Sequence, residues 1–286
     1  MKSNIRVTKA SGEQELFDEH KLRRSLRSAG AHGDTVDRIV ESIHQLLHDG
    51  ISTQKIYREA FDLLKEDSKR LAGRYKLKDA ILELGPTGFP FEKFIAELLN
   101  HQGYKTENGI VVEGDCVSHE IDVIAQKDNE HFMIECKFHN RKGHTCDVKI
   151  PLYIQSRFLD VKRKWTSLPG HKNKVHKGWV VTNTRFTKDA EQYAECIGLK
   201  LLSWDYPKNN GLKDLISRAK LHPVTCLSSM DKMEKKHLLD ADIVLCSQLL
   251  DHTEMLDKIG IASRKKNQIL KEARAICNNN YQENNL

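Results

Sequence analysis

The sequence predicts an α/β multidomain protein with a mostly helical N-terminal domain, a central domain that holds the main strands, and a helical C-terminal domain. Two observations predict this division. The chain has 286 residues, more than the roughly 100 to 200 of one domain. Residues 85–90 and 207–211 are rich in Pro, Gly and Asn, which break helical patterns. We therefore expect domains at residues 1–84, 85–207 and 208–286.

Composition excludes two classes of protein. Hydrophobic residues make up 39% of the chain and mean hydropathy is −0.57, so the chain is neither a membrane protein nor a disordered one. No apolar run approaches the roughly 18 residues of a spanning helix, and the first residues do not resemble a signal peptide. The seven cysteines form no Cys-x-x-Cys pair. Reduced thiols in the cytoplasm, with no membrane partner, are therefore expected.

Positive charge is concentrated in residues 137–177, which we call the basic segment. It holds eleven Lys or Arg and two Asp, a local charge of +9, whereas the whole chain carries +6. Clustered cations gain free energy by releasing counterions from nucleic acid, so the segment favours DNA as a partner. A solvated basic surface is the alternative interpretation.

Helical spacing of apolar residues predicts helices in both terminal domains. The N-terminal domain begins with a predicted strand at residues 5–9 and a turn at residues 11–12, and Asp18 is the predicted N-cap of the first helix. Apolar residues then recur at helical spacing: Leu22, Leu26, Ile39, Ile43, Leu47, Ile56, Ala60, Phe61 and Leu64. Similar stripes after residue 211 predict helices there.

Acidic side chains recur in a predicted hairpin of the central domain. Residues 119–125 and 131–137 are strand-like, and a two-residue turn would pair residues whose numbers sum to 257. Asp122 then lies opposite Glu135, with their Cβ atoms about 4.5 to 5.5 Å apart. Two such carboxylates repel unless a cation lies between them, and Mg²⁺ or Mn²⁺ suits oxygen ligands. The alternative is an exposed polar face that Lys137 balances.

The order of motifs around this hairpin resembles a nuclease family. The strand 121–124 (IDVI) and the strand 134–137 (IECK) resemble the Mrr-like branch of the PD-(D/E)xK nuclease superfamily. Residues 91–99, 177–183 and 186–190 resemble a core helix, strand and helix of that branch. The resemblance covers about 120 residues. It implies a restriction-endonuclease-like α/β core with a mixed sheet.

The nuclease resemblance also implies roles for individual residues. Asp122 and Glu135 would bind the metal, and Lys137 would position a water or stabilise the attacked phosphate. Glu92 would be a further carboxylate, with a solvated helix residue as the alternative, and Gln155 matches an active-site Gln of the branch. A zinc site is not expected, because the nearby Cys and His residues lack a second ligand pair: Cys136, His139 and His144.

The N-terminal domain resembles the ATP-cone, a regulatory domain of many ribonucleotide reductases. The similarity lies in residues 7–9, 11–12, 15, 17–18, 21–26 and 49–53. It implies an adenine nucleotide, ATP or dATP, as regulatory ligand. The residues of the expected site are Lys9 and Lys21 for the phosphates, Glu15, Thr53 and Tyr57 for the base or ribose, and Val7.

One feature departs from the cone pattern. The usual Lys-Arg-Asp-Gly turn is Lys-Ala-Ser-Gly at residues 9–12, so an arginine that commonly grips phosphate is absent. This departure affects the expected affinity and nucleotide preference. A cone kept only for contacts within an oligomer is the alternative, and a homo-oligomer is expected.

Residues 256–266 of the C-terminal domain resemble the hairpin of a helix-hairpin-helix module. The exposed amides of the second helix and Lys265 or Lys266 would grip a phosphate without regard to sequence. Residues 239–243 are a weaker match without the glycine. Helical packing or dimerisation is an equal alternative.

Together these features favour a cytoplasmic, Mg²⁺-dependent DNA endonuclease that a nucleotide regulates, in a setting of defence against foreign DNA that the resemblance alone implies. A nucleotide-responsive DNA-binding regulator with an inactive nuclease fold is the main alternative. A pure assembly scaffold is a third, which the basic segment disfavours.

Overall fold

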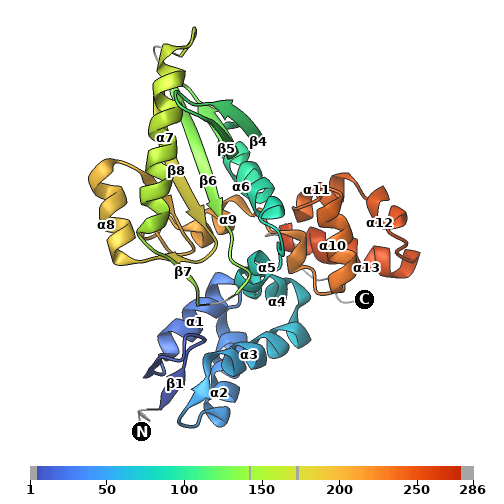
Figure 1. Ribbon diagram of the computed structural model, residues 1–286. Coiled ribbons are helices and arrows are strands. Elements are labelled where there is room, and N and C mark those ends of the chain that lie inside the picture. The colour runs from blue at the N-terminus through green and yellow to red at the C-terminus, as the bar shows by residue number, and fades with distance from the viewer. Residues whose placement is uncertain (1–4, 142, 172–173, 278–286) are drawn as a thin grey trace. The chain divides into compact units, whose positions relative to one another are not determined.

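The computed structural model describes residues 5–141, 143–171 and 174–277 (Figure 1). Lys142 and Lys172 of the basic segment lie outside these residues. The chain groups into two compact units. The first unit combines residues 1–80 with residues 222–286, and the second unit spans residues 81–221. Residues 207–211 form a turn within the second unit, and the division into three domains stays a prediction.

The N-terminal part of the first unit is mostly helical, as predicted. Its elements are β1 (Arg6–Thr8), β2 (Gln14–Leu16), α1 (Glu19–Ser28), α2 (Gly33–Leu46), β3 (Ile51–Ser52), α3 (Thr53–Asp67) and α4 (Lys69–Tyr75). β1 pairs antiparallel with β2 and parallel with β3. The Asp18 carboxylate accepts the amide of Lys21 at 3.2 Å, so the predicted N-cap of α1 is confirmed.

The apolar residues predicted at helical spacing form the core of this part. Leu22, Leu26, Ile39, Ile43, Ile56, Ala60 and Leu64 are buried in one cluster. Leu47 and Phe61 pack against the cluster and stay partly exposed. Leu47 lies at the C-cap of α2, where the helix has ended.

The C-terminal part of the first unit is helical, as predicted. It comprises the 3₁₀ turn Val224–Cys226, α10 (Lys232–Asp240), α11 (Cys246–Asp251), α12 (Glu254–Lys258) and α13 (Ser263–Cys277). The hydroxyl of Thr225 donates to the carbonyl of Ala80 at 2.7 Å. The guanidinium of Arg74 donates to the carbonyl of Ile276 at 2.9 Å. These bonds join two segments that are far apart in sequence.

The second unit is an α/β core. After α5 (Leu77–Leu82), which contains residues of both units, come α6 (Phe89–His101), β4 (Lys105–Glu113), β5 (Ser118–Lys127), β6 (Glu130–Lys137), β7 (Thr145–Cys146), α7 (Lys149–Ser167), β8 (Val175–Thr182), β9 (Arg185–Phe186), α8 (Lys188–Ile197), β10 (Lys200–Leu202) and α9 (Leu212–Ala219). The main sheet has the order β10-β8-β6-β5-β4. It is mixed, because β10, β8 and β6 are parallel whereas β5 and β4 are antiparallel.

Helices cover this sheet. Buried residues of α7 and α8 form an apolar cluster with residues of β5, β6 and β8, and Figure 1 shows α7 running along the sheet. α6 packs on β4 and β5. It begins at Phe89, inside the segment expected to interrupt helices, because Pro90 falls in the first turn, where a proline needs no amide partner.

The predicted register of the central hairpin is confirmed. β5 and β6 pair from Val123 opposite Ile134 to Lys127 opposite Glu130, and the numbers of paired residues sum to 257. Asp128 occupies the two-residue turn at φ 51°, a left-handed conformation that Asp tolerates. The pairing ends at Val123, so the predicted pair of Asp122 with Glu135 lies beyond the ladder.

Side-chain alternation along β5 changes phase at Asp122. Ile121 and Ile124 belong to the same apolar cluster, although strict alternation puts residues three apart on opposite faces. The pairs between β4 and β5 skip Asp122 and Gly109, and Gly109 has φ 61°. Such local irregularities in a sheet redirect a side chain. Asp122 therefore forms no regular ladder pair with either neighbouring strand, β4 or β6.

Asp160 of α7 anchors the segment that leads into β5. Its carboxylate accepts the amides of Cys116 and Val117 at 2.9 and 3.3 Å, and its oxygen lies 2.8 Å from Nε2 of His119. The contact with His119 and these amides hold the pKa of Asp160 well below its usual range. A lowered pKa stabilises the fold above the unfolded pKa of about 4, and this contribution is lost as pH falls.

Asp160→Asn is expected to lower the free energy of unfolding at pH 7, because an amide NH₂ would face the backbone N–H donors of Cys116 and Val117. Urea denaturation measures the change. Asp115→Asn is the control, since Asp115 is exposed. The difference in the free energy of unfolding between wild type and Asp160→Asn should become smaller as pH falls toward 3. Equal unfolding free energies at pH 7 would contradict the anchoring role.

Candidate functional site

Asp122 and β6 come together through a backbone contact. The amide of Cys136 donates to a carboxylate oxygen of Asp122 at 2.7 Å. Glu135 and Lys137 flank Cys136, and successive strand side chains point to opposite faces, so they share one face of β6. The bond therefore brings the carboxylate of Asp122 to the part of β6 that carries the other two predicted residues.

Glu135 is 5% exposed and engages two cations. Nζ of Lys137 lies 2.6 Å from Oε1, and Nη1 of Arg157 lies 2.6 Å from Oε2. Arg157, from α7, also donates to the carbonyl of Glu120. It thereby links the buried carboxylate to β5. The sequence placed Arg157 only in the basic segment, and its position on a separate helix gave no signal for this contact.

Burial and mutual repulsion raise the pKa of two carboxyl groups here. Burial raises the pKa of Asp122 to about 6, with a further contribution from Glu135. Burial, followed by repulsion from Asp122, Glu120 and Glu135, raises the pKa of Glu92 to about 7. Glu92 of α6 thus lies close enough for electrostatic repulsion by these carboxylates to raise its pKa. Clusters of perturbed carboxyl groups are typical of functional sites.

Gln155 lies on α7, two residues before Arg157, and is half-buried. Within residues 5–141, 143–171 and 174–277, no hydrogen bond joins Gln155 to Asp122, Glu135 or Lys137. Its predicted role stays a prediction.

The donor set suits a hard divalent cation. Asp122, Glu135 and Glu92 offer carboxylate oxygens from two strands and a helix, and no sulfur or imidazole belongs to the set. Mg²⁺ and Mn²⁺ prefer such ligands. A cation would also relieve the repulsion that raises the pKa of Asp122 and Glu92.

Glu92→Gln is expected to raise the melting temperature at pH 8 by several degrees and to leave it nearly unchanged at pH 5. A carboxyl group whose folded pKa is raised contributes stability below its unfolded pKa, and this stability is lost as pH rises through about 7. The neutral amide of Gln does not ionise, so the variant keeps its stability as pH rises. Thermal melting at the two pH values measures the difference from wild type, with Glu97→Gln on the same helix as control. An equal shift at both pH values would contradict the crowding of carboxylates.

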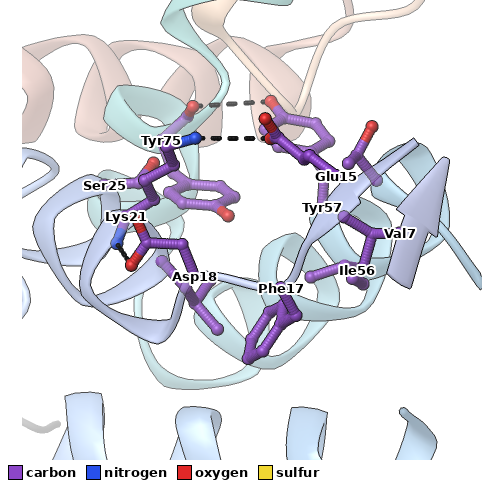
Figure 2. A pocket seen from close by; sticks show the side chains of 11 residues that line it. Val7, Glu15, Phe17, Asp18, Lys21, Ser25, Ile56, Tyr57 and Tyr75 are labelled. Carbon is purple, nitrogen blue, oxygen red and sulfur yellow. Dashed lines mark hydrogen bonds and ion pairs between the residues drawn. The ribbon is translucent and has the colours of Figure 1, made fainter. Parts of the chain in front are cut away.

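A second candidate site is a cavity of about 170 Å³ in the first unit. Figure 2 shows side chains around it. Its lining contains five of the six residues predicted from the cone resemblance: Val7, Glu15, Lys21, Thr53 and Tyr57. Lys9 is not part of the lining, but its Nζ lies 2.8 Å from a carboxylate oxygen of Glu15. The remaining lining residues were not predicted: Phe17, Asp18, Leu22, Ser25, Ile56 and Tyr75.

Charge and aromatic surface meet in this cavity. Glu15 lies between two lysines, since Nζ of Lys21 is 3.3 Å from its other oxygen. Hydrogen bonds from Lys9 and then Lys21 lower the pKa of Glu15. Tyr57 and Tyr75 stack with ring centroids 5.0 Å apart and an angle of 13°. Tyr75 comes from α4, a different helix from the α3 of Tyr57, so the spacing within one helix could not assign it to the site.

Residues 256–266, expected to form a hairpin, span the end of α12, a turn and the start of α13. Gly260, at φ 80°, follows α12 and precedes α13. Both lysines expected to face phosphate contact acids: Lys265 lies 2.5 Å from Glu234, and Lys266 lies 2.6 Å from Asp257. At residues 239–243, Asp242 takes a positive φ of 65° in place of a glycine.

Comparisons with known proteins identify the family. Residues 222–277 match the family model described as AF1548-like, C-terminal. An uncharacterized protein of Archaeoglobus fulgidus is 37% identical over 183 residues, which are 64% of this chain and 99% of that protein. The chain belongs to the AF1548-like family. The crystal structure of the protein of unknown function AF1548 superposes with a TM-score of 0.56 at 34% identity, over 67% of this chain and 98% of that one.

Residues 85–153 of this AF1548-like chain match a second model, the Mrr restriction endonuclease. The matched segment contains Glu92, Asp122, Glu135 and Lys137, and it ends before Gln155 and Arg157. The prediction of a restriction-endonuclease-like core is confirmed. Of the helices in the described residues, none combines the length and apolar character that crossing a bilayer requires.

Proposed function

We propose that this protein is a metal-dependent endonuclease that hydrolyses phosphodiester bonds of DNA. One observation carries the proposal: Asp122 meets the part of β6 that bears Glu135 and Lys137, inside a segment that matches a restriction endonuclease. This is the set of groups that phosphodiester hydrolysis needs, namely carboxylates for a divalent cation and a nearby ammonium.

Each residue has a distinct task in this proposal. Asp122 and Glu135 would hold Mg²⁺ or Mn²⁺, and the ion would supply Lewis acidity to a water and to the phosphate. Lys137 places its ammonium beside the scissile group and stabilises the negative charge that develops there. Glu92 would supply a further carboxylate from α6 beside the cation.

DNA is the proposed substrate because two residues of the basic segment contact Glu135 and others are exposed on α7. Lys137 and Arg157 belong to the basic segment, and Lys149, Lys162 and Arg163 of the same segment are exposed on α7. Exposed cations on one helix bind the phosphate backbone without reading sequence. Defence against foreign DNA is the setting that we propose for such an enzyme.

A nucleotide-responsive DNA-binding regulator is the second candidate. The observation in its favour is that both oxygens of Glu135 already contact cations, Lys137 and Arg157. A divalent ion must compete with Arg157 for this carboxylate. If Glu135 keeps its contact with Arg157 and binds no ion, the protein binds DNA and does not cut it.

Supercoiled plasmid separates the two candidates. The protein is incubated with plasmid and Mg²⁺, Mn²⁺ or EDTA, with and without ATP or dATP. We expect nicked and linear DNA with either metal and intact plasmid in EDTA. Plasmid that is retarded in a gel but stays intact with every metal and nucleotide would reject the enzyme and support the regulator.

We also propose that ATP or dATP binds the cavity of the first unit and regulates the enzyme. The lysines around Glu15 suit phosphate, and the stacked pair Tyr57 and Tyr75 suits a base. Release of Lys21 from Glu15 would free its ammonium for the nucleotide. Regulation requires that the nucleotide bind two states of the protein with different affinity.

The C-terminal hairpin is proposed to bind phosphate or to mediate a homo-oligomer. DNA binding there requires that Lys265 and Lys266 exchange their carboxylate partners for phosphates. The exchange is easier for Lys266, whose partner Asp257 is exposed, than for Lys265, whose partner Glu234 is half-buried.

A further inference from the structure

Three histidines gather at the start of β6 and β8. His131 lies at the second position of β6, His176 at the second position of the parallel strand β8, and His171 follows α7. One ring nitrogen from each residue lies within 4.8 Å of those of the other two. His131 and His176 are buried and His171 is half-buried. The three rings therefore face one small volume that His171 leaves open to solvent.

The spacing of the rings fits coordination of one ion. Nδ1 of His131 and Nδ1 of His176 are 3.3 Å apart. Two nitrogens bound to one tetrahedral zinc at about 2.0 to 2.1 Å are separated by roughly 3.3 to 3.4 Å. A hydrogen bond between two neutral imidazoles is the competing explanation of this distance, and the experiment below separates the two.

Two ring nitrogens in the cluster lack a partner. Nδ1 of His171 and Nε2 of His176 are buried and have no hydrogen-bond partner among the described residues. A buried imidazole nitrogen without a partner is costly, whether it carries a lone pair or a proton. A metal bond uses such a lone pair.

The surroundings keep the imidazoles neutral. Burial lowers the pKa of His131 to about 4 and also lowers the pKa of His171 and His176. Lys174 and Lys162 contribute to these shifts and are the charged side chains that face the rings. Neutral imidazole is the form that binds metals, and it prefers transition ions to Mg²⁺.

We propose that His131, His171 and His176 form a binding site for a divalent transition-metal ion such as Zn²⁺, which ties the segment after α7 to β6 and β8. Three imidazoles leave one position of a tetrahedral ion for water. Four residues separate His131 from Glu135 along β6, about 13 Å at strand rise, so this site is separate from the carboxylates.

Co²⁺ is the probe for this site, because its visible absorption reports tetrahedral coordination. Untagged full-length protein is stripped with EDTA, desalted and titrated with Co²⁺ and then Zn²⁺. The double variant Asp122→Asn with Glu135→Gln is titrated in parallel, since it lacks the carboxylates of the proposed nuclease site. Trp165 stacks on His131 with centroids 4.3 Å apart, so quenching of its fluorescence is a second readout.

Three histidine variants locate the ion. His171→Gln removes the half-buried ligand, His101→Gln on α6 is the matched exposed control, and His171→Cys replaces one ligand by another. We expect one equivalent of tetrahedral Co²⁺, as read from the visible absorption, in wild type, in the double variant and in His101→Gln, with displacement by Zn²⁺. Affinity should fall at least tenfold in His171→Gln. His171→Cys should add a sulfur-to-cobalt charge-transfer band, which a packing role would not produce.

Absence of tetrahedral Co²⁺ absorption in the double variant would overturn the proposal, and the cluster would then be a hydrogen-bonded part of the core. Unchanged affinity in a folded His171→Gln protein would overturn it as well. Neither result depends on plasmid cleavage, so failure of this site leaves the nuclease proposal intact.

Discussion

Asp122→Asn is expected to reduce metal-dependent cleavage of plasmid at least about 100-fold, the scale of losing one group that stabilises the transition state. The amide keeps an oxygen that can accept the amide of Cys136, so the local backbone contact survives. The negative charge that would hold the cation is lost. Because burial disfavours the charged form of Asp122, the variant should melt at or above the temperature of wild type at pH 8.

Matched variants separate loss of chemistry from loss of structure. Asp115→Asn makes the same change at an exposed aspartate and should cut as wild type. Lys137→Ala should lose cleavage to a similar degree, whereas Lys188→Ala, at an exposed lysine of α8 outside the basic segment, should cut. Cleavage rates are measured on supercoiled plasmid with saturating Mn²⁺. Full activity in a folded Asp122→Asn protein would remove Asp122 from the site.

ATP or dATP is expected to raise the melting temperature of wild type by about 5 to 10 °C at a concentration 100 times its dissociation constant. A ligand that binds only the folded state stabilises it by about 2.7 kcal/mol at that concentration, and each kcal/mol raises the melting temperature by about 2 to 4 °C in a protein of this size. Lys21→Ala should abolish the shift, because Lys21 is the exposed ammonium of the cavity.

Arg24→Ala is the control for Lys21→Ala, since it removes one positive charge from the exposed side of the same helix. It should keep the nucleotide shift. Both variants are compared by thermal melting without ligand first, so that a change in basal stability is separated from loss of binding. The same melting temperature of wild type with and without nucleotide would reject the regulatory site.

The hairpin of the second unit was predictable because its information is local. A two-residue turn fixes the register of both strands, and the paired residue numbers sum to 257 as expected. The phase change at Asp122 was not predictable. It arises where β4 passes beside β5 at Gly109, and the sequence of the hairpin does not record how its neighbour pairs.

Long-range contacts decided which side chains join each candidate site. Arg157 reaches Glu135 across 22 positions, and Tyr75 stacks on Tyr57 across 18. In neither pair do the two residues belong to the same helix or strand, so no local periodicity brings them together. The same holds for His131 and His176, which the parallel pairing of β6 with β8 places side by side.

The order of apolar and polar residues by itself determined the helices of the first unit, the central hairpin and the type of groups at its end. The 3.6-residue period of a helix and the 2-residue period of a strand are local, so a short stretch of sequence is enough to show them. Only the folded chain decided that Asp122 leaves its ladder, that Arg157 occupies Glu135, and that three histidines meet. These depend on how separate elements pack, where burial and the distance between charges are set by residues far away in sequence.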